Sequence, residues 1–169
     1  MKRLFSLLTL CALMLALTAC GGNNASSGGT SSGATSSGGE VSFDAVYQGI
    51  LNAQENTDEL IFFPEEGADA IESLYPGLSA LNPSRVQLYL PPVTGYACEI
   101  LLVEVAEGDV DAAKAILQDR IDSGANDTGY PENAVLWQNN AQIQVQGNCL
   151  CLIALPDGYI IPENVFALG

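Results

Sequence analysis

The sequence predicts an α+β fold, a two-layer sandwich in which an antiparallel sheet of about four strands is covered on one face by helices. Three observations predict it. Segments of helical periodicity alternate with segments of period two, two pairs of strand-like segments flank one helix, and turn motifs connect the members of each pair. Because short turns join strands of opposite direction, the sheet should be antiparallel.

The helical segments share apolar residues spaced three and four apart, with polar residues between them. The first has a serine before it as N-cap, and the second stops at a Pro-Gly pair. The predicted helices are, in order, 43–54 (after Ser42), 68–75 (before Pro76-Gly77), one that lies between an N-cap Asp109 and a C-cap Gly124, and one turn over 132–137.

The strand segments alternate between apolar and polar residues or are apolar throughout. Residues 97–105 contain the apolar run Ile100–Val103, which predicts a central strand buried on both faces. Two further segments are ambiguous: residues 60–63 fit a short strand or a buried loop, and residues 159–161 fit a short edge strand. The predicted strands are 85–90, 97–105, 141–146 and 149–155, the last two joined by Gly147-Asn148.

The residues before this domain have the layout of an export signal. Lys2 and Arg3 precede an uncharged apolar run over residues 4–17, and small residues lead to Ala19 and Cys20. The run is short for a membrane span, which needs about 20 residues. We therefore expect a removable signal peptide over residues 1–19, the alternative being an uncleaved anchor helix.

The four residues Leu17-Thr18-Ala19-Cys20 resemble the bacterial lipobox. The resemblance implies that the Cys20 thiol is lipidated and that the chain is cut between Ala19 and Cys20. Two acyl chains on Cys20 would give stable anchoring where one is marginal. Residues 20–39 are then a lipidated cysteine with a Gly/Ser-rich tether, which spans about 25 Å as a flexible coil. Residues 40–169 remain for a single domain.

The charge of the chain is strongly acidic, with 20 Asp and Glu against 5 Lys and Arg among 169 residues. Loss of Lys2 and Arg3 with the signal would leave three basic residues and a net charge of −17. Such a charge disfavours nucleic acid and anionic membrane surfaces as partners. The membrane contact should therefore go through the lipid on Cys20 alone.

Three cysteines remain in the predicted domain: Cys98, Cys149 and Cys151. Cys149 and Cys151 lie two apart on one strand, so both should point to the same face. Two readings stay open, buried free thiols or one disulfide from Cys98 to the last strand. The chain has no histidine, and we predict no metal site and no cofactor.

The residue inventory leaves few catalytic devices. Without histidine, His-based nucleophilic triads and the usual zinc hydrolase sites are excluded. Glu99 and Glu104 are five apart on one strand, so they should lie on opposite faces of the sheet. Trp137 and Tyr130 are candidates for stacking on a sugar or peptide, the alternative being that Trp137 closes the end of the core.

Several stretches resemble a family of small lipoproteins of clostridial, Gram-positive type whose domain has no known function. The resemblance covers roughly residues 43–155 and implies attachment to the outer face of the cytoplasmic membrane. It carries over no catalytic residue. The stretches are Tyr75-Pro76-Gly77-Leu78, Tyr89-Leu90-Pro91-Pro92, residues 97–105, residues 111–120 and Gly147-Asn148.

These observations favour a membrane-anchored extracytoplasmic lipoprotein that is not an enzyme. Its role would be to bind or support another envelope component, either a protein or a glycan. Two alternatives stay open: a hydrolase that uses carboxylates on cell-wall or other glycans, and a small solute-binding lipoprotein serving a transporter. The oligomeric state is undetermined, although the polar face of strand 141–146 offers a surface for a second copy.

Overall fold

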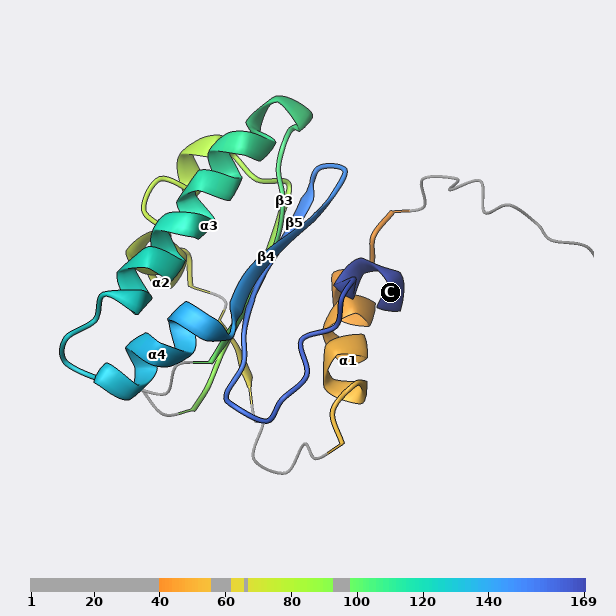
Figure 1. Ribbon diagram of the computed structural model, residues 1–169. Coiled ribbons are helices and arrows are strands. Elements are labelled where there is room, and N and C mark those ends of the chain that lie inside the picture. The colour runs from red at the N-terminus through yellow and green to blue at the C-terminus, as the bar shows by residue number, and fades with distance from the viewer. Residues whose placement is uncertain (1–39, 56–61, 66, 93–97) are drawn as a thin grey trace, which may run out of the picture. The chain divides into compact units, whose positions relative to one another are not determined.

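The computed structural model describes residues 40–55, 62–65, 67–92 and 98–169. They form a five-stranded antiparallel sheet of order β1-β2-β3-β5-β4, with helices on both of its faces (Figure 1). The elements are α1 (Phe43–Asn52), β1 (Phe63–Glu65), α2 (Ala68–Leu74), β2 (Arg85–Leu90), β3 (Glu99–Glu104), α3 (Val110–Ala125), α4 (Pro131–Asn139), β4 (Ala141–Gln146) and β5 (Cys149–Ala154), with the short 3₁₀ helices η1 (Ser79–Leu81), η2 (Glu107–Asp109) and η3 (Val165–Leu168).

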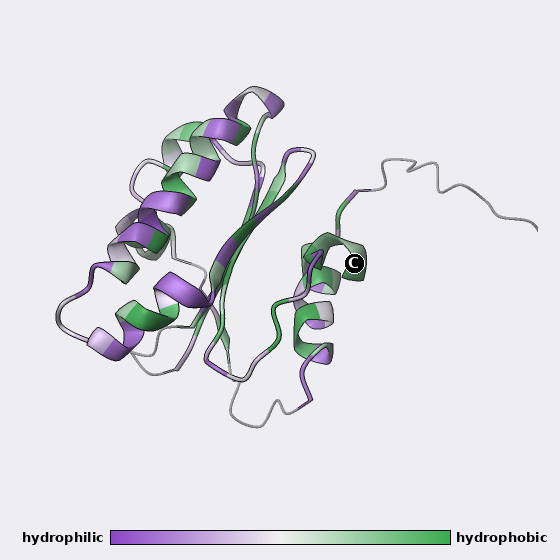
Figure 2. Cartoon of the chain, in the orientation of Figure 1, coloured by the Kyte–Doolittle hydropathy of each residue, from purple (hydrophilic) through white to green (hydrophobic). Residues whose placement is uncertain are grey.

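The two middle strands of the sheet, β3 and β5, pair along their full length, from Glu99 opposite Ala154 to Glu104 opposite Cys149. All six residues of β5 and the first five of β3 are buried. This burial on both sides explains why their sequences are apolar runs without alternation. Figure 2 shows the same distribution, with hydrophobic strands between helices whose outer sides are hydrophilic.

Alternate residues of β3 point to two separate cores. Ile100 and Leu102 pack towards α1, whereas Leu101 and Val103 pack towards α3. The core on the α1 side also holds three buried residues of α1 and two of η3: Phe43, Val46, Ile50, Val165 and Phe166. The core on the α3 side also holds residues next to α2 and residues of α3 and α4: Tyr75, Leu78, Ala113, Leu117 and Trp137.

The predicted α+β class with an antiparallel sheet is confirmed, and two details of the architecture differ. The sheet has five strands, because Phe63–Glu65 pairs with Leu88–Leu90 as β1. Helices cover both faces instead of one, because α1 and the segment after β5 pack against the face opposite α3. Gly49 lets η3 lie close to α1, since a Cβ at that position would lie 2.4 Å from Leu168 Cβ.

The element boundaries follow the periodicity closely. The strands predicted over 85–90 and 141–146 have those bounds, and every other helix or strand end lies within two residues of its predicted position. The Ser42 side chain caps α1 as expected, accepting a hydrogen bond from the Ala45 amide at 3.3 Å. Residues 159–161 form no strand. Residues 60 and 61 lie outside the described residues.

The sequence predicts Gly124 as the C-cap of α3, and this is wrong, because the helix continues to Ala125. Its small size serves packing. A Cβ at Gly124 would lie 2.4 Å from Cγ of Trp137, so only glycine lets the indole of α4 reach α3.

No helix in the described part of the chain is both long enough and apolar enough to cross a bilayer.

Candidate functional site

Glu99 is the one charged residue that is buried among the described residues, with 2% of its surface exposed. It begins β3 and points to the α3 side of the sheet. Its Oε2 accepts a hydrogen bond from Arg120 Nη2 at 2.5 Å, and its Oε1 accepts one from Arg120 Nε at 3.3 Å and another from the Tyr75 hydroxyl. The carboxylate is therefore held by two neighbours from two other segments.

Local structure brings these partners to Glu99. Tyr75 is the C-cap of α2, where Pro76 and Gly77 end the helix and turn the ring inwards, and it is fully buried. Arg120 comes from α3, and its guanidinium carbon lies 4.6 Å from the centre of the Trp137 ring. One cluster thus connects α2, β3, α3 and α4.

The electrostatics of this cluster keep Tyr75 neutral and Arg120 protonated. Burial and the adjacent negative charge of Glu99 raise the pKa of Tyr75 well above 10, so its hydroxyl stays a neutral donor. Burial by itself would lower the pKa of Arg120, but the hydrogen bonds and charge of Glu99 outweigh it and raise that pKa. Because both oxygens of Glu99 accept from fixed donors, the geometry suits a structural ion pair better than a proton-transferring group.

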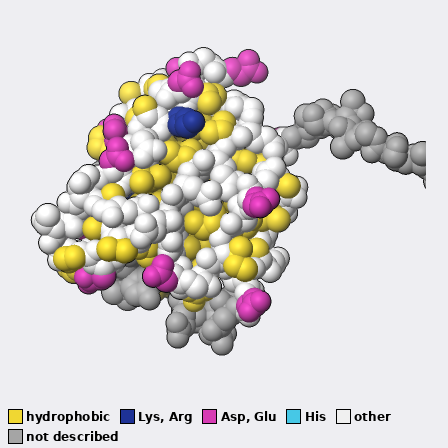
Figure 3. All heavy atoms as spheres, in the orientation of Figure 1, with side chains coloured by type: hydrophobic (Ala, Val, Ile, Leu, Met, Phe, Trp, Pro, Cys, Tyr) yellow, Lys and Arg dark blue, Asp and Glu magenta, His cyan; other side chains and the backbone are white. Residues whose placement is uncertain are grey.

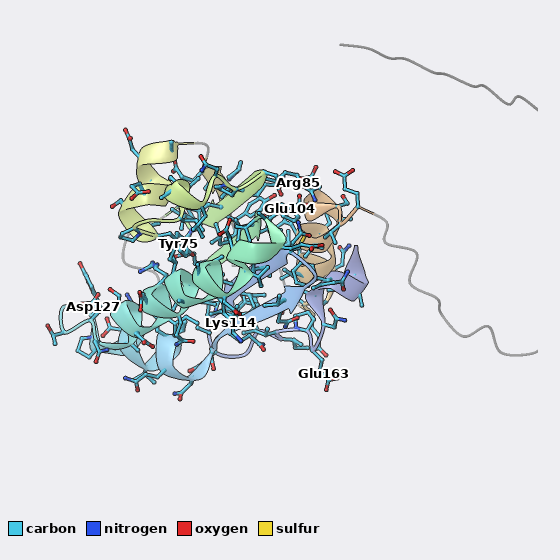
Figure 4. The ribbon with its side chains drawn as sticks, turned by 90° about the horizontal axis from the view of Figure 1, so that it is seen from above. Tyr75, Arg85, Glu104, Lys114, Asp127 and Glu163 are labelled. Carbon is cyan, nitrogen blue, oxygen red and sulfur yellow. The ribbon has the colours of Figure 1, made fainter. Side chains whose placement is uncertain are left out.

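A second ion pair lies on the opposite face, between Arg85 of β2 and Glu104 of β3 (Figure 4). Arg85 Nε lies 2.6 Å from Glu104 Oε2, and the Asn148 side chain donates to Oε1 of Glu104 at 3.2 Å. The hydrogen bond from Arg85 is the main cause that lowers the pKa of Glu104. Glu99 and Glu104 therefore do lie on opposite faces of the sheet, as predicted, and cannot act on one substrate together.

Arg85 also fastens the first described residues to the sheet. Its Nη1 donates to the carbonyl of Val41 at 2.9 Å and lies 3.3 Å from Glu40 Oε1. Its guanidinium carbon lies 4.5 Å from the centre of the Phe43 ring. The segment that enters the domain is thus held at β2 before α1 begins.

Two surface grooves run beside β2 and share Asp44, Val86 and Gln87 in their walls. The first has a volume of about 590 Å³ and is lined also by residues 40–43. The second has a volume of about 490 Å³ and reaches β1 at Pro64 and Glu65. Together they form what we call the β2 groove, with Glu40, Asp44 and Glu65 as its acidic groups.

The aromatic candidates lie apart from the β2 groove. Trp137 is 5% exposed, with Arg120 over its ring and Gly124 against its edge, so it is a core residue and offers no face for a ligand. The alternative reading, that Trp137 closes the end of the core, is what the structure shows. Tyr130 is 53% exposed and precedes α4 as its N-cap residue.

The three cysteines are free and buried, which is the first of the two readings that the sequence left open. All three belong to the core on the α1 side, so Cys149 and Cys151 share a face as predicted. Burial, followed by the charge of Glu99, raises the pKa of Cys98 to about 12, and burial likewise raises that of Cys151. Such thiols are poor nucleophiles.

The predicted cleavage and lipidation residues, Ala19 and Cys20, lie outside the described residues.

The polar face of β4 is in contact with another segment of the chain. Gln144, at the centre of the polar face of β4, donates to the carbonyl of Pro162 at 2.7 Å and accepts from the Val165 amide at 2.8 Å. The polar face therefore anchors the segment after β5. Among the described residues, no three acidic or cysteine side chains gather as metal ligands would.

The sequence did not reveal the cluster of Tyr75, Glu99 and Arg120. One signal was available: a glutamate directly before the most apolar run of the chain has to be paired if that run is buried. The sequence could not identify the partners of Glu99, because Arg120 and Tyr75 are 21 and 24 residues away from it.

Comparison with protein families matches residues 66–155 to a family described as a domain of unknown function, DUF4358. The match covers slightly more than half of the 169 residues. No curated protein and no solved structure matches the chain.

Proposed function

The chain belongs to the DUF4358 family, and on that premise we propose that it is a lipid-anchored module on the outer face of the cytoplasmic membrane of a Gram-positive bacterium. In this proposal it binds or supports another envelope component and catalyses no reaction. The support comes from the lipobox at Cys20, the Gly/Ser-rich tract behind it, and the acidic charge of the domain.

The observation that carries this proposal is the attachment of residues 40 and 41 to Arg85. These residues follow directly on the tract that we expect to be the tether. Arg85 holds them by one hydrogen bond and one ion pair and is itself bound to Glu104 at the end of β3. A pull on the tether would therefore reach β2 and β3 before it could unwind α1, which suits a domain that works at the end of an anchor.

The β2 groove is the surface we assign to binding. It lies beside the point where the tether enters, and its walls include Glu40, Asp44 and Glu65. Figure 3 shows acidic side chains spread over the visible face, with little basic surface between them. A partner with basic or hydroxyl groups, such as a cationic protein segment or a glycan, fits these walls.

The two alternatives receive less support. A retaining or inverting glycan hydrolase needs two carboxylates that flank one bond. Glu99 and Glu104 lie on opposite faces, and each is held by an arginine. A solute-binding protein of the usual kind closes two lobes over its ligand, whereas the described residues are organised around one sheet.

Anchoring is tested with the variant Cys20→Ala and a control, Cys11→Ala, in cells fed an alkyne analogue of palmitate. The proposal predicts that the native chain and the control carry the label and sediment with membranes. The Cys20→Ala chain should carry no label and lose its membrane attachment. Equal labelling of both variants would refute attachment through Cys20.

Binding is tested with a photo-cross-linking residue placed in the full chain in living cells. At Gln87, in the wall of the β2 groove, it should give one defined adduct. At Gln118, an exposed glutamine of α3, the adduct should be absent. Equal adducts at both positions, or none at either, would contradict the groove as the binding surface, and turnover of any glycan by the purified chain would contradict the non-enzymatic role.

A further inference from the structure

The two edges of the sheet differ in how they are protected. β1, at one edge, has only three residues, and two of them are Pro64 and Glu65. β4, at the other edge, has six residues, Ala-Gln-Ile-Gln-Val-Gln, with no charge and no proline. Proteins usually guard a long edge strand with lysine, proline or a bulge, because an unguarded edge is a template for another strand. Only β1 carries such a guard.

We propose that β4 pairs antiparallel with β4 of a second copy of this chain, so that two sheets join into one. The interaction surface is the outer edge of residues 141–146, and the partner is the same edge related by a two-fold axis. The inference is independent of the lipid anchor and of the β2 groove.

The turn between β4 and β5 shows which backbone groups face outwards. Gly147 has a φ of 60° and Asn148 has no positive φ, which is the pattern of a type II′ turn. In such a two-residue hairpin the flanking residues, here Gln146 and Cys149, exchange both of their backbone hydrogen bonds.

Alternation along the ladder then turns Gln142 and Gln144 towards β5 as well. The hydrogen bond from the Leu155 amide to the Asn140 carbonyl continues this pattern beyond the strand. The amides and carbonyls of Ala141, Ile143 and Val145 therefore point to the open side. Within the described residues, these groups have no hydrogen-bond partner in the structure.

A second copy fits this edge better than a different partner for two reasons. The strand is self-complementary: a two-fold axis normal to the sheet places glutamine opposite glutamine and aliphatic residues opposite aliphatic residues. It is also uncharged in a chain whose processed form would carry −17, so here two copies approach without direct repulsion between the strands. Val145, 42% exposed, would be covered by the pairing.

The mass of the full chain, as isolated from the cells that produce it, tests the proposal. Native mass spectrometry should find a dimer that dissociates on dilution. Val145→Lys should raise the dissociation constant by about tenfold or more, because lysine on an edge strand blocks pairing. Val135→Lys is the matched control: Val135 is 52% exposed and belongs to α4, not to the pairing strand, so the dimer of this variant should be unchanged.

Each other outcome overturns the proposal. A wild-type chain that stays monomeric at every concentration does not pair through β4. The same result is expected if the β4 edge binds a different protein. A dimer that resists Val145→Lys, or that Val135→Lys weakens equally, uses another surface.

Hydrogen exchange of the wild-type chain gives a second test that needs no variant. The amides of Ile143 and Val145 have no partner in one copy, so they should exchange quickly in dilute solution. If β4 pairs with itself, their exchange should slow as the concentration rises, while the amide of Gln144, bonded to β5, should change little. Fast exchange of Ile143 and Val145 at every concentration would overturn the proposal.

Discussion

Arg120 and Glu99 meet in a buried ion pair, with Nη2 of the arginine 2.5 Å from Oε2 of the glutamate, although one comes from a helix and the other from the central strand. Their side chains are 19% and 2% exposed. The pair fixes how α3 sits on the sheet, and Tyr75 and Trp137 complete it from α2 and α4. The stability of the domain should therefore depend on it.

Removal of Arg120 alone should lower the free energy of unfolding more than replacement of all three polar residues of the cluster. Arg120→Met leaves Glu99 charged and unpaired, so we expect a loss of about 3–5 kcal/mol in the free energy of unfolding. The combined change Arg120→Met, Glu99→Leu, Tyr75→Phe should recover most of it, because no buried polar group is left without a partner. Denaturant unfolding measures both. Lys114→Met, at an exposed position of α3, is the control. A single variant as stable as wild type would show that the pair contributes nothing.

Gly124→Ala should have two opposing effects on stability, a gain from helix propensity and a loss from overpacking. Propensity alone predicts a gain of about 1 kcal/mol in a helix interior. The added Cβ would meet the Trp137 ring at 2.4 Å, so we expect a net loss of about 1–3 kcal/mol from overpacking. The thermal midpoint of the variant should fall. Gly108→Ala, where a Cβ meets nothing within 4 Å, should leave it nearly unchanged. A midpoint that rises in Gly124→Ala would contradict the close contact.

Acid should remove the contribution of the Arg85–Glu104 pair. Because the folded pKa of Glu104 lies below its usual value of 4.5, the pair stabilises the fold above that pH, and this is lost as the pH falls through the folded pKa. Glu104→Gln should thus be less stable than wild type at pH 7, with the difference narrowing in acid. Urea unfolding at several pH values measures it, with Glu163→Gln as a comparison. A difference that does not depend on pH would contradict the ionic contribution.

The free thiols should be inert in the folded chain. Cys98, Cys149 and Cys151 are buried and their pKa values are raised by burial, so iodoacetamide at pH 8 should leave them unmodified. In denaturant all three should react, as intact mass would show. A chain that gains only one label in denaturant without reductant would instead contain the disulfide.

The parts of the fold that local pattern determines could be predicted. β2 and β4 alternate strictly, and their bounds were predicted to the residue. The apolar run in β3 correctly predicted burial on both faces. β1 was predicted only in part: its first residue, Phe63, ends the stretch 60–63 that fits a short strand or a buried loop. Its three residues are exposed and include a proline, so pairing with β2 determines this strand and local pattern does not.

Relationships between distant segments were beyond the sequence. The stripe of α1 showed that the helix is buried, but not on which face of the sheet. That choice depends on residues 156–169, which pack beside α1. Trp137 is similar: the sequence left a ligand-stacking position and closure of the core both open, and only the contacts with Gly124 and Arg120, both on α3, place it in the core.

The anchor at Cys20 underlies the proposed function, and the mass of the native N-terminus tests this anchor most directly. The chain should be isolated from its own membranes, digested, and its first peptide identified by mass spectrometry. We predict that this peptide begins at Cys20 and carries a diacylglyceryl group. A peptide that begins at Met1, or a Cys20 without lipid, would contradict the anchor.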